Sequence, residues 1–248
     1  MKSSERRHLQ TNEFAIAVSR VQTWFEQNRT AVLGSAVAVA IVAAGVLGYT
    51  AWQRSVNTKA ATLLAEAMVI AESGVQPPAP PAGTTNDPTN PGGQLPGSYP
   101  TLDAKLNAAL PKFMAAADAY PNTAAGQTAR LHAAETLAQM GRRDEAIQQY
   151  DQLIGSGNAL VARSARLGKA SAQMVAGQYD PAIATLKEMA AQADSPLPAE
   201  ALLMELARAY RLAGKTDDAR KTLTQVVEQH ADSPYASDAK VEIAKLKS

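Results

Sequence analysis

GRRDEAI, residues 141–147, is the stretch that decides the fold, because its pattern occurs three times in the chain. The matching stretches are GQYDPAI at 177–183 and GKTDDAR at 214–220. Each begins with glycine, has aspartate three residues later and alanine five residues later, and the glycines are 36 and 37 residues apart. Self-similarity at such a period predicts an array of similar helical hairpins, each stacked on the next.

The residue types at the repeated positions predict how each hairpin is built. A glycine is expected to end one helix in a left-handed backbone conformation, and an aspartate to cap the next helix, with Pro181 at a first helical position. An alanine is expected where two helices come closest, and a large apolar residue nine positions after the glycine is expected to fill the core. The aspartates are Asp144, Asp180 and Asp217; the alanines are Ala146, Ala182 and Ala219; the core residues are Tyr150, Leu186 and Leu223.

This spacing resembles the tetratricopeptide repeat, whose period is about 34 residues. The match is degenerate, because the aromatic residue that the repeat carries four positions before the glycine survives only as Tyr210, against Leu137 and Gln173. The resemblance implies an all-α fold: a right-handed α-solenoid of tetratricopeptide-like hairpins over residues 101–248. A helix ending near Leu246 is expected to cap its open end.

A second stretch, AVLGSAVAVAIVAAGVLGYTAW at 31–52, contains no charge and no proline. A helix of this length matches a hydrocarbon core of about 30 Å, and Arg29 and Arg54 bracket it. A buried core helix would normally show a polar stripe, and a cleaved export signal would have a shorter apolar run closer to the start. We therefore expect one uncleaved transmembrane helix, with Tyr49 and Trp52 at one interface.

The charges on either side of this stretch predict its orientation. Basic residues are more numerous before it than in the twenty-odd residues after it, so the positive-inside rule keeps the N-terminus in the cytoplasm. The basic residues of the tail are Lys2, Arg6, Arg7, Arg20 and Arg29. In a bacterium this topology corresponds to an inner-membrane protein whose C-terminal domain is periplasmic.

Composition divides the remaining chain. Residues 1–30 are expected to form a cytoplasmic tail with an amphipathic helix, 53–74 an extracytoplasmic helix, and 75–100 a Pro/Gly-rich linker, since eight of the fourteen prolines lie there. The linker is expected to separate the helix before it from the helical segment 102–120. Pro111 is expected to divide that segment into two short helices.

Two helical faces in the N-terminal part are candidate contact surfaces. Apolar residues of the tail share one face, which would lie on the inner leaflet or dock a cytoplasmic partner. These residues are Phe14, Val18, Val21, Trp24 and Phe25. Small residues recur every four positions in the apolar stretch and form a ridge that lets helices approach closely, unless the alanine-rich composition produces it by chance. These residues are Ala36, Ala40, Ala44 and Gly48.

The sequence offers little for chemistry. It has no cysteine and three histidines, and His132 with Glu135 lacks a further predicted metal ligand. The GKT at 214–216 lacks the preceding glycine and loop of a phosphate-binding motif, and no catalytic motif occurs. We therefore expect no enzymatic activity, no cofactor, no metal and no small-molecule substrate. The net charge of +1 also argues against nucleic-acid binding.

Protein binding is the remaining function class. If the repeats follow the expected geometry, the first helix of each hairpin lines a concave groove, and its residues are set by their distance before each glycine. Mobile Leu and Met side chains beside a few charges suit adaptable contacts with peptides or partner helices, although several of them would equally suit the core between hairpins. The groove residues are Leu131, Glu135, Gln139, Leu167, Ser171, Met174, Met204, Arg208 and Arg211.

The layout resembles the bacterial ancillary Sec-translocon subunit family: a short tail with an aromatic amphipathic helix, one span, and translocated degenerate repeats. AYPNTA at 119–124, leading into 131–147, is the part most like it. The resemblance implies partners among translocon subunits, a membrane-anchored prolyl-isomerase-type chaperone and exported clients. Two alternatives stay open: a scaffold for outer-membrane protein or cell-wall assembly, and a signalling element acting through its cytoplasmic tail.

Overall fold

The computed structural model describes residues 19–20, 22–76, 97–191 and 198–246. Within these ranges the regular structure is helical, apart from one isolated bridge between Val75 and Tyr99. The all-α prediction is therefore confirmed. The chain divides into two compact units, Met1–Ser55 and Val56–Ser248.

The helix α2 (Arg29–Glu72) contains the apolar stretch 31–52. The described side chains of that stretch are all exposed, which disfavours its assignment as a buried core helix. By length and composition, α2 is the one helix among the described residues that could cross a membrane. Signal sequences meet the same test, so the span itself stays a prediction.

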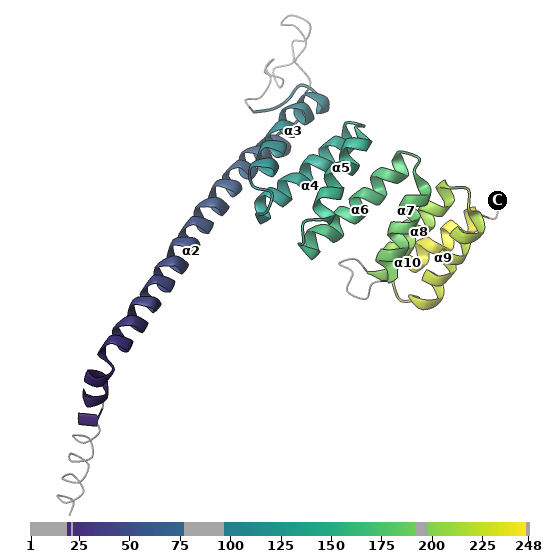
Figure 1. Ribbon diagram of the computed structural model, residues 1–248. Coiled ribbons are helices and arrows are strands. Elements are labelled where there is room, and N and C mark those ends of the chain that lie inside the picture. The colour runs from purple at the N-terminus through teal and green to yellow at the C-terminus, as the bar shows by residue number, and fades with distance from the viewer. Residues whose placement is uncertain (1–18, 21, 77–96, 192–197, 247–248) are drawn as a thin grey trace, which may run out of the picture. The chain divides into compact units, whose positions relative to one another are not determined.

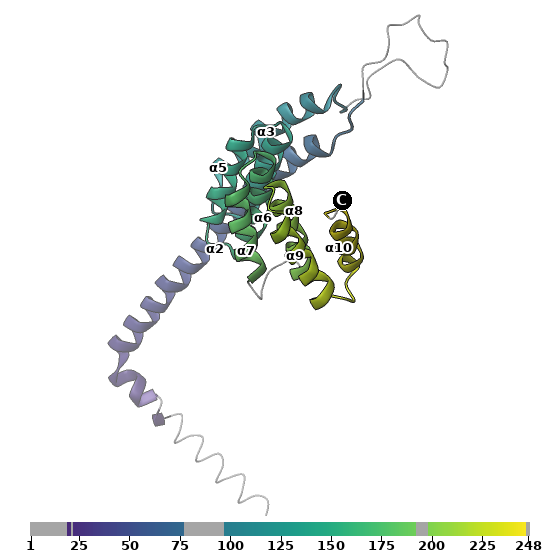
Figure 2. The same ribbon diagram turned by 90° about the vertical axis from the view of Figure 1, so that its right-hand side faces the viewer.

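The second unit is a succession of helices, each packed against its neighbours in sequence (Figures 1 and 2). The helices after α2 are α3 (Leu102–Ala119), α4 (Ala124–Gln139), α5 (Arg143–Ile154), α6 (Ala159–Val175), α7 (Tyr179–Ala191), α8 (Ala199–Leu212), α9 (Thr216–Gln229) and α10 (Pro234–Lys245). The first helix of one hairpin also meets the first helix of another, α4 against α6 and α8 against α10. This is the packing of a helical-repeat solenoid, with α10 covering α8 and α9 at the C-terminal end.

Left-handed glycines end the helices α4, α6 and α8 as predicted. The φ angles of Gly141, Gly177 and Gly214 are 77°, 77° and 73°. After each glycine, the next residue donates its N–H to a carbonyl five positions back, as Gln178 does to Gln173 at 2.8 Å. This Schellman arrangement satisfies carbonyls that the helix end would otherwise leave open, and it turns the chain back into the next helix.

The capping role predicted for the aspartates is wrong. Helices α5 and α9 begin after Arg142 and Lys215, neither of which makes a side-chain cap hydrogen bond. The aspartates instead occupy the second position of α5, α7 and α9, and Pro181 is the third residue of α7 rather than the first. In the first turn, the positive end of the helix dipole still stabilises the negative charge of each carboxylate. One of them, Asp180, also accepts a hydrogen bond from Lys215 at 2.6 Å.

The helix α3 is continuous, so the prediction that Pro111 divides it is also wrong. Pro111 lies on the exposed side of α3, between the buried residues Leu110 and Phe113. The carbonyl that loses its partner is four residues back, at Asn107, which is also exposed. Water can satisfy that carbonyl while the buried face of the helix keeps its packing.

The Pro-rich stretch does not separate the helices on either side of it. Gln76 donates its N–H to the Tyr99 carbonyl at 2.8 Å, and Tyr99 donates to the Gly74 carbonyl at 2.9 Å. These bonds hold the two ends of the stretch together. The end of α2 shares a core with α3, through Ala67 against a cluster that includes Phe113. The expected separation is therefore wrong, because the backbone closes the insert at its base.

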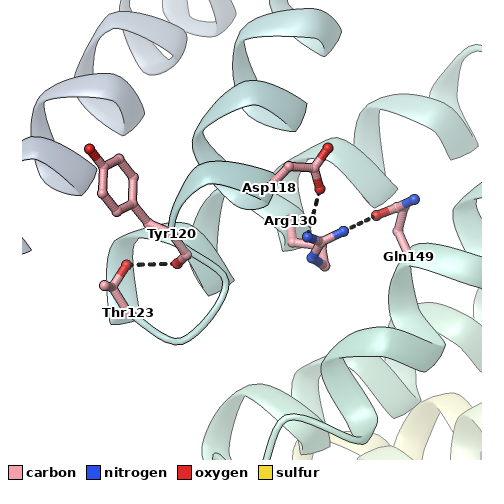
Figure 3. Close-up of polar contacts among 5 residues, drawn as sticks. All are labelled: Asp118, Tyr120, Thr123, Arg130 and Gln149. Atoms are coloured by element: carbon pink, nitrogen blue, oxygen red, sulfur yellow. Dashed lines mark hydrogen bonds and ion pairs between the residues drawn. The ribbon is translucent and has the colours of Figure 1, made fainter. Parts of the chain in front are cut away.

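The residues predicted to fill the hairpins are buried. Ala146, Ala182 and Ala219 are all 0% exposed, and the large residues four positions further on are buried as well. At the first hairpin, a polar cluster reinforces this packing (Figure 3). The buried Arg130 of α4 donates to Asp118 of α3 at 2.8 Å and to Gln149 of α5 at 2.7 Å. A buried guanidinium requires such partners, so the cluster fixes α4 between its two neighbours.

Replacing Gly177 by alanine is expected to lower the free energy of unfolding by about 1 kcal/mol, because L-residues disfavour the left-handed region. A Cβ at this position would meet no atom within 4 Å, so the effect comes from the backbone alone. Urea unfolding of the purified full-length chain, followed by circular dichroism, measures it. Gly74→Ala is the matched control: its Cβ would also meet no atom, and its φ is not positive. Equal stability of both variants would contradict the assigned role.

Candidate functional site

A groove of about 770 Å³ runs along one side of the second unit. Residues from α4, α6 and α8 line it, with contributions from α5, α7 and α10. Seven of the nine predicted groove residues are among them. These are Leu131, Glu135, Leu167, Ser171, Met174, Met204 and Arg208. The structure thus brings together residues from three repeats, although their role in binding a partner stays a prediction.

The two other predicted groove residues lie in neighbouring hollows. Gln139 lines a hollow of about 120 Å³ formed by α3, α4 and the end of α2. Arg211 lines a hollow of about 400 Å³ formed by α8, α9 and α10. Glu135 borders the first of these hollows as well as the groove, and Arg208 borders the second, so the surfaces are continuous at these residues.

Sequence reasoning missed several groove residues. Arg163 and Val175 complete a stripe on α6 with Leu167 and Ser171, spaced four residues apart. Extending the four-residue spacing in both directions from Leu167 and Ser171 would have predicted both residues. Side chains from the second helices were missed for other reasons. Tyr150 of α5 and Leu186 of α7 had been assigned to the core, and Met189 of α7 had been given no role.

Tyr150 reaches the groove because α6 has a glycine beside it. A Cβ on Gly168 would lie 2.5 Å from the Tyr150 ring, so a larger residue there would displace the ring. Tyr150 is buried, and burial raises the pKa of its hydroxyl to about 12, with the nearby Glu135 carboxylate contributing. The hydroxyl therefore stays protonated at physiological pH. It makes no hydrogen bond to the described part of the chain.

The predicted pair His132 and Glu135 is present at the edge of the groove. Their side chains are 3.0 Å apart, and the imidazole lies against the Phe113 ring at a centroid distance of 5.4 Å. The hydrogen bond to Glu135 raises the pKa of His132, while partial burial opposes the rise. No cluster of three potential metal ligands occurs in the described residues.

The predicted contact surfaces of the N-terminal unit are partly described. The small-residue ridge from Ala36 to Gly48 lies on α2 with all four of its members exposed. Trp24 and Phe25 are also exposed, at 60% and 47%. The other members of the tail face, Phe14, Val18 and Val21, lie outside the described residues. The described members of both surfaces are exposed, and the contacts of both surfaces stay predictions.

The His132–Glu135 pair predicts a pH dependence of stability. Because the pKa is raised in the folded state, the pair stabilises fully below the unfolded value of about 6.5, and its contribution disappears as pH rises through the folded value. His132→Gln is expected to destabilise more at pH 5.5 than at pH 8.5. The difference should be below about 1 kcal/mol, since the pair is partly exposed. Unfolding curves at both pH values measure this. In a Glu135→Gln background the same substitution should lose this pH dependence or reverse it, because burial alone lowers the pKa of His132.

Solved structures with the same arrangement of helices are tetratricopeptide-like repeats. The nearly identical repeats assigned to a kinesin light chain of Podosopora anserina match with a TM-score of 0.50 and 20% identity. A variant of the same repeats matches with a TM-score of 0.50 and 21% identity. Each match covers 58% of this chain and 78% of the other. At this identity the likeness shows the fold alone.

Sequence families give the same result over a longer stretch. No curated protein matches the chain. The tetratricopeptide repeat family matches residues 176–243, which include the last two of the three glycine motifs. The tetratricopeptide repeat-like domain family matches residues 22–201, well over half of the chain. The chain therefore belongs to the tetratricopeptide repeat-like domain family.

Proposed function

We propose that the protein is a membrane-anchored, non-enzymatic adaptor that binds protein segments in its groove, beside the Sec translocon, and assists newly exported proteins. One observation carries the binding part of the proposal. Leu131, Leu167 and Met204, predicted from their distances before three different glycines, line a single groove. Repeats of this family form interaction scaffolds, which use such extended inner faces to bind proteins.

The anchoring part of the proposal rests on α2. Its stretch 31–52 is uncharged, exposed and about as long as a bilayer core is thick. The excess of basic residues before it supports a cytoplasmic N-terminus and a periplasmic repeat domain. The proposed partners, which are translocon subunits, a membrane-anchored chaperone and exported chains, follow from the resemblance of the tail, the span and residues 119–124 to the translocon-associated family.

Single-cysteine labelling tests the orientation, because the chain has no cysteine of its own. Leu160→Cys, exposed on α6, is expected to react with a membrane-impermeant maleimide in intact spheroplasts. Gln22→Cys, exposed before α2, is expected to react only after lysis. Both positions are accessible in the folded chain, so each variant controls for the reactivity of the other. The reverse labelling pattern would contradict the proposed topology.

In-cell photo-crosslinking tests the partners. A photoreactive residue at Ser171 samples the groove from an exposed position, and one at Ala40 samples the ridge of α2. We expect exported chains or a chaperone in the adducts from Ser171, and translocon subunits in those from Ala40. Mass spectrometry identifies the adducts. Leu160, exposed on the same helix as Ser171 but not part of the groove, is the matched control.

Other adducts would contradict the proposal in distinguishable ways. Outer-membrane or cell-wall assembly factors at Ser171, with no translocon subunit at Ala40, would indicate an assembly scaffold. A cytoplasmic regulator crosslinked from Trp24, and lost when Trp24 and Phe25 are replaced by serine, would indicate signalling through the tail. If the same proteins crosslinked in the same amounts from Ser171 and from Leu160, the groove would not be the binding site.

A further inference from the structure

The second unit contains two hydrophobic cores, which divide within α6. The first core joins the end of α2 to α3, α4 and α5, and it takes Ala165 and Ala172 from α6. The second core joins α7, α8, α9 and α10, and it takes Ala170 and Met174 from the same helix. Among the described residues, α6 is thus the one element that both cores share. A change of angle between the two parts disturbs fewer apolar contacts here than it would inside either core.

Side-chain hydrogen bonds tie α4 to α6, and α8 to α10, at the starts of these helices. Asn158, the N-cap of α6, donates from its side-chain amide to Oε1 of Gln127 in α4 at 2.9 Å. Ser233, the N-cap of α10, donates from its hydroxyl to Oε1 of Glu200 in α8 at 3.2 Å. Each N-cap therefore holds its own helix beside the first helix of the preceding hairpin.

The N-cap of α8 makes no bond of this kind. It is Pro198, whose side chain has no polar atom and forms no cap hydrogen bond. Part of the groove lies between α6 and α8, where Leu186 and Met189 of the intervening α7 are among the lining residues. The helices α6 and α8 accordingly approach each other less closely than α4 and α6 do, or α8 and α10.

One residue of α6 departs from its counterparts at the same place. Four residues before each glycine of the repeat stand Leu137, Gln173 and Tyr210. Leu137 belongs to the first core and Tyr210 to the second. Gln173 is buried like both of them, at 5% exposed, but its amide adds little apolar surface to either core.

The buried amide of Gln173 also favours a second arrangement of the helices. Its Oε1 atom is enclosed and has no hydrogen-bond partner in the described part of the chain. An enclosed acceptor without a donor is unfavourable, and water that reaches it removes this cost. An arrangement of the helices that admits water to Gln173 is therefore closer in free energy to the enclosed one than it would be with leucine at this position.

We infer that the second unit bends at the junction between α6 and α8, and that Gln173 keeps this junction adjustable. The gap between the two helices then opens and closes, while α4 stays against α6 and α8 stays against α10. The inference goes beyond the proposed function, because it concerns the shape of the unit and holds whatever the groove binds. It also differs from uniform bending of a solenoid, which would be shared equally by all of its junctions.

Distances between pairs of nitroxide spin labels test the inference, since the chain has no cysteine of its own. The label positions are Gln139, Val175 and Leu212, each exposed and each two residues before a glycine of the repeat. The pair Gln139→Cys and Val175→Cys spans α4 and α6, and the pair Val175→Cys and Leu212→Cys spans α6 and α8. Pulsed electron double resonance on the full-length protein in detergent micelles should give a distance distribution about twice as broad for the second pair, because hinge motions exceed the fluctuations of packed helices.

Gln173→Leu tests the role of the buried amide. It introduces the residue that stands at the equivalent position of α4, and it removes the enclosed oxygen that has no partner. In this background the distribution between Val175 and Leu212 should narrow to about the width found between Gln139 and Val175. Gln152→Leu, the same exchange at an exposed position of α5, is the matched control and should leave both distributions unchanged.

Two results would overturn the inference. Equal widths for the two label pairs in the otherwise unchanged protein would show that bending is uniform or absent. An unchanged distribution between Val175 and Leu212 in the Gln173→Leu variant would show that the buried amide does not keep the junction adjustable. Thermal melts of each labelled variant exclude partial unfolding as the cause of a broad distribution.

Discussion

The fold of the second unit depends on the left-handed turn that ends the first helix of each hairpin; these first helices, α4, α6 and α8, are the inner helices that line the groove. Gly141, Gly177 and Gly214 adopt a backbone conformation that other residues avoid, and hydrogen bonds across each turn fix the direction of the next helix. Since the turn recurs at nearly constant spacing, successive inner helices present the same positions to the same side. Ala146 and its two counterparts then allow the paired helices to approach closely.

Features with a local physical cause could be predicted from the sequence. Helical periodicity, counted back from each glycine, placed Leu167 and Met204 at equivalent positions, and both line one groove. The role of Asp144 was predicted wrongly, because a cap and a first-turn acid both place a carboxylate near a helix start. The part of the groove that the second helices line could not be predicted, since the access of Tyr150 and Leu186 to the groove depends on how far apart neighbouring helices stand. That separation results from packing across the whole hairpin, which a short sequence window does not contain.

The groove shows how an irregular repeat differs from a regular one. An array with identical hairpins would close every gap between inner helices equally. Here Gln173 replaces the aromatic residue of its repeat, the core divides within α6, and the open part of the groove lies on the same helix. The departure from the repeat pattern, rather than the pattern itself, thus distinguishes this inner face from a uniform one. Gly168 contributes in the same way, because it admits the ring of Tyr150.

Because Val75 and Tyr99 form a bridge, the stability of the repeats depends little on the length of the Pro-rich stretch between them. Because Gln76 and Gly74 are hydrogen-bonded to Tyr99, the free energy of joining the two ends depends on the number of residues between them through the entropy of loop closure. Doubling the length of such a loop costs only about 0.6 kcal/mol. Insertions and deletions can therefore accumulate there during evolution with little selective penalty on folding, and foreign epitopes or reporter sequences can be placed there without disturbing the helices on either side.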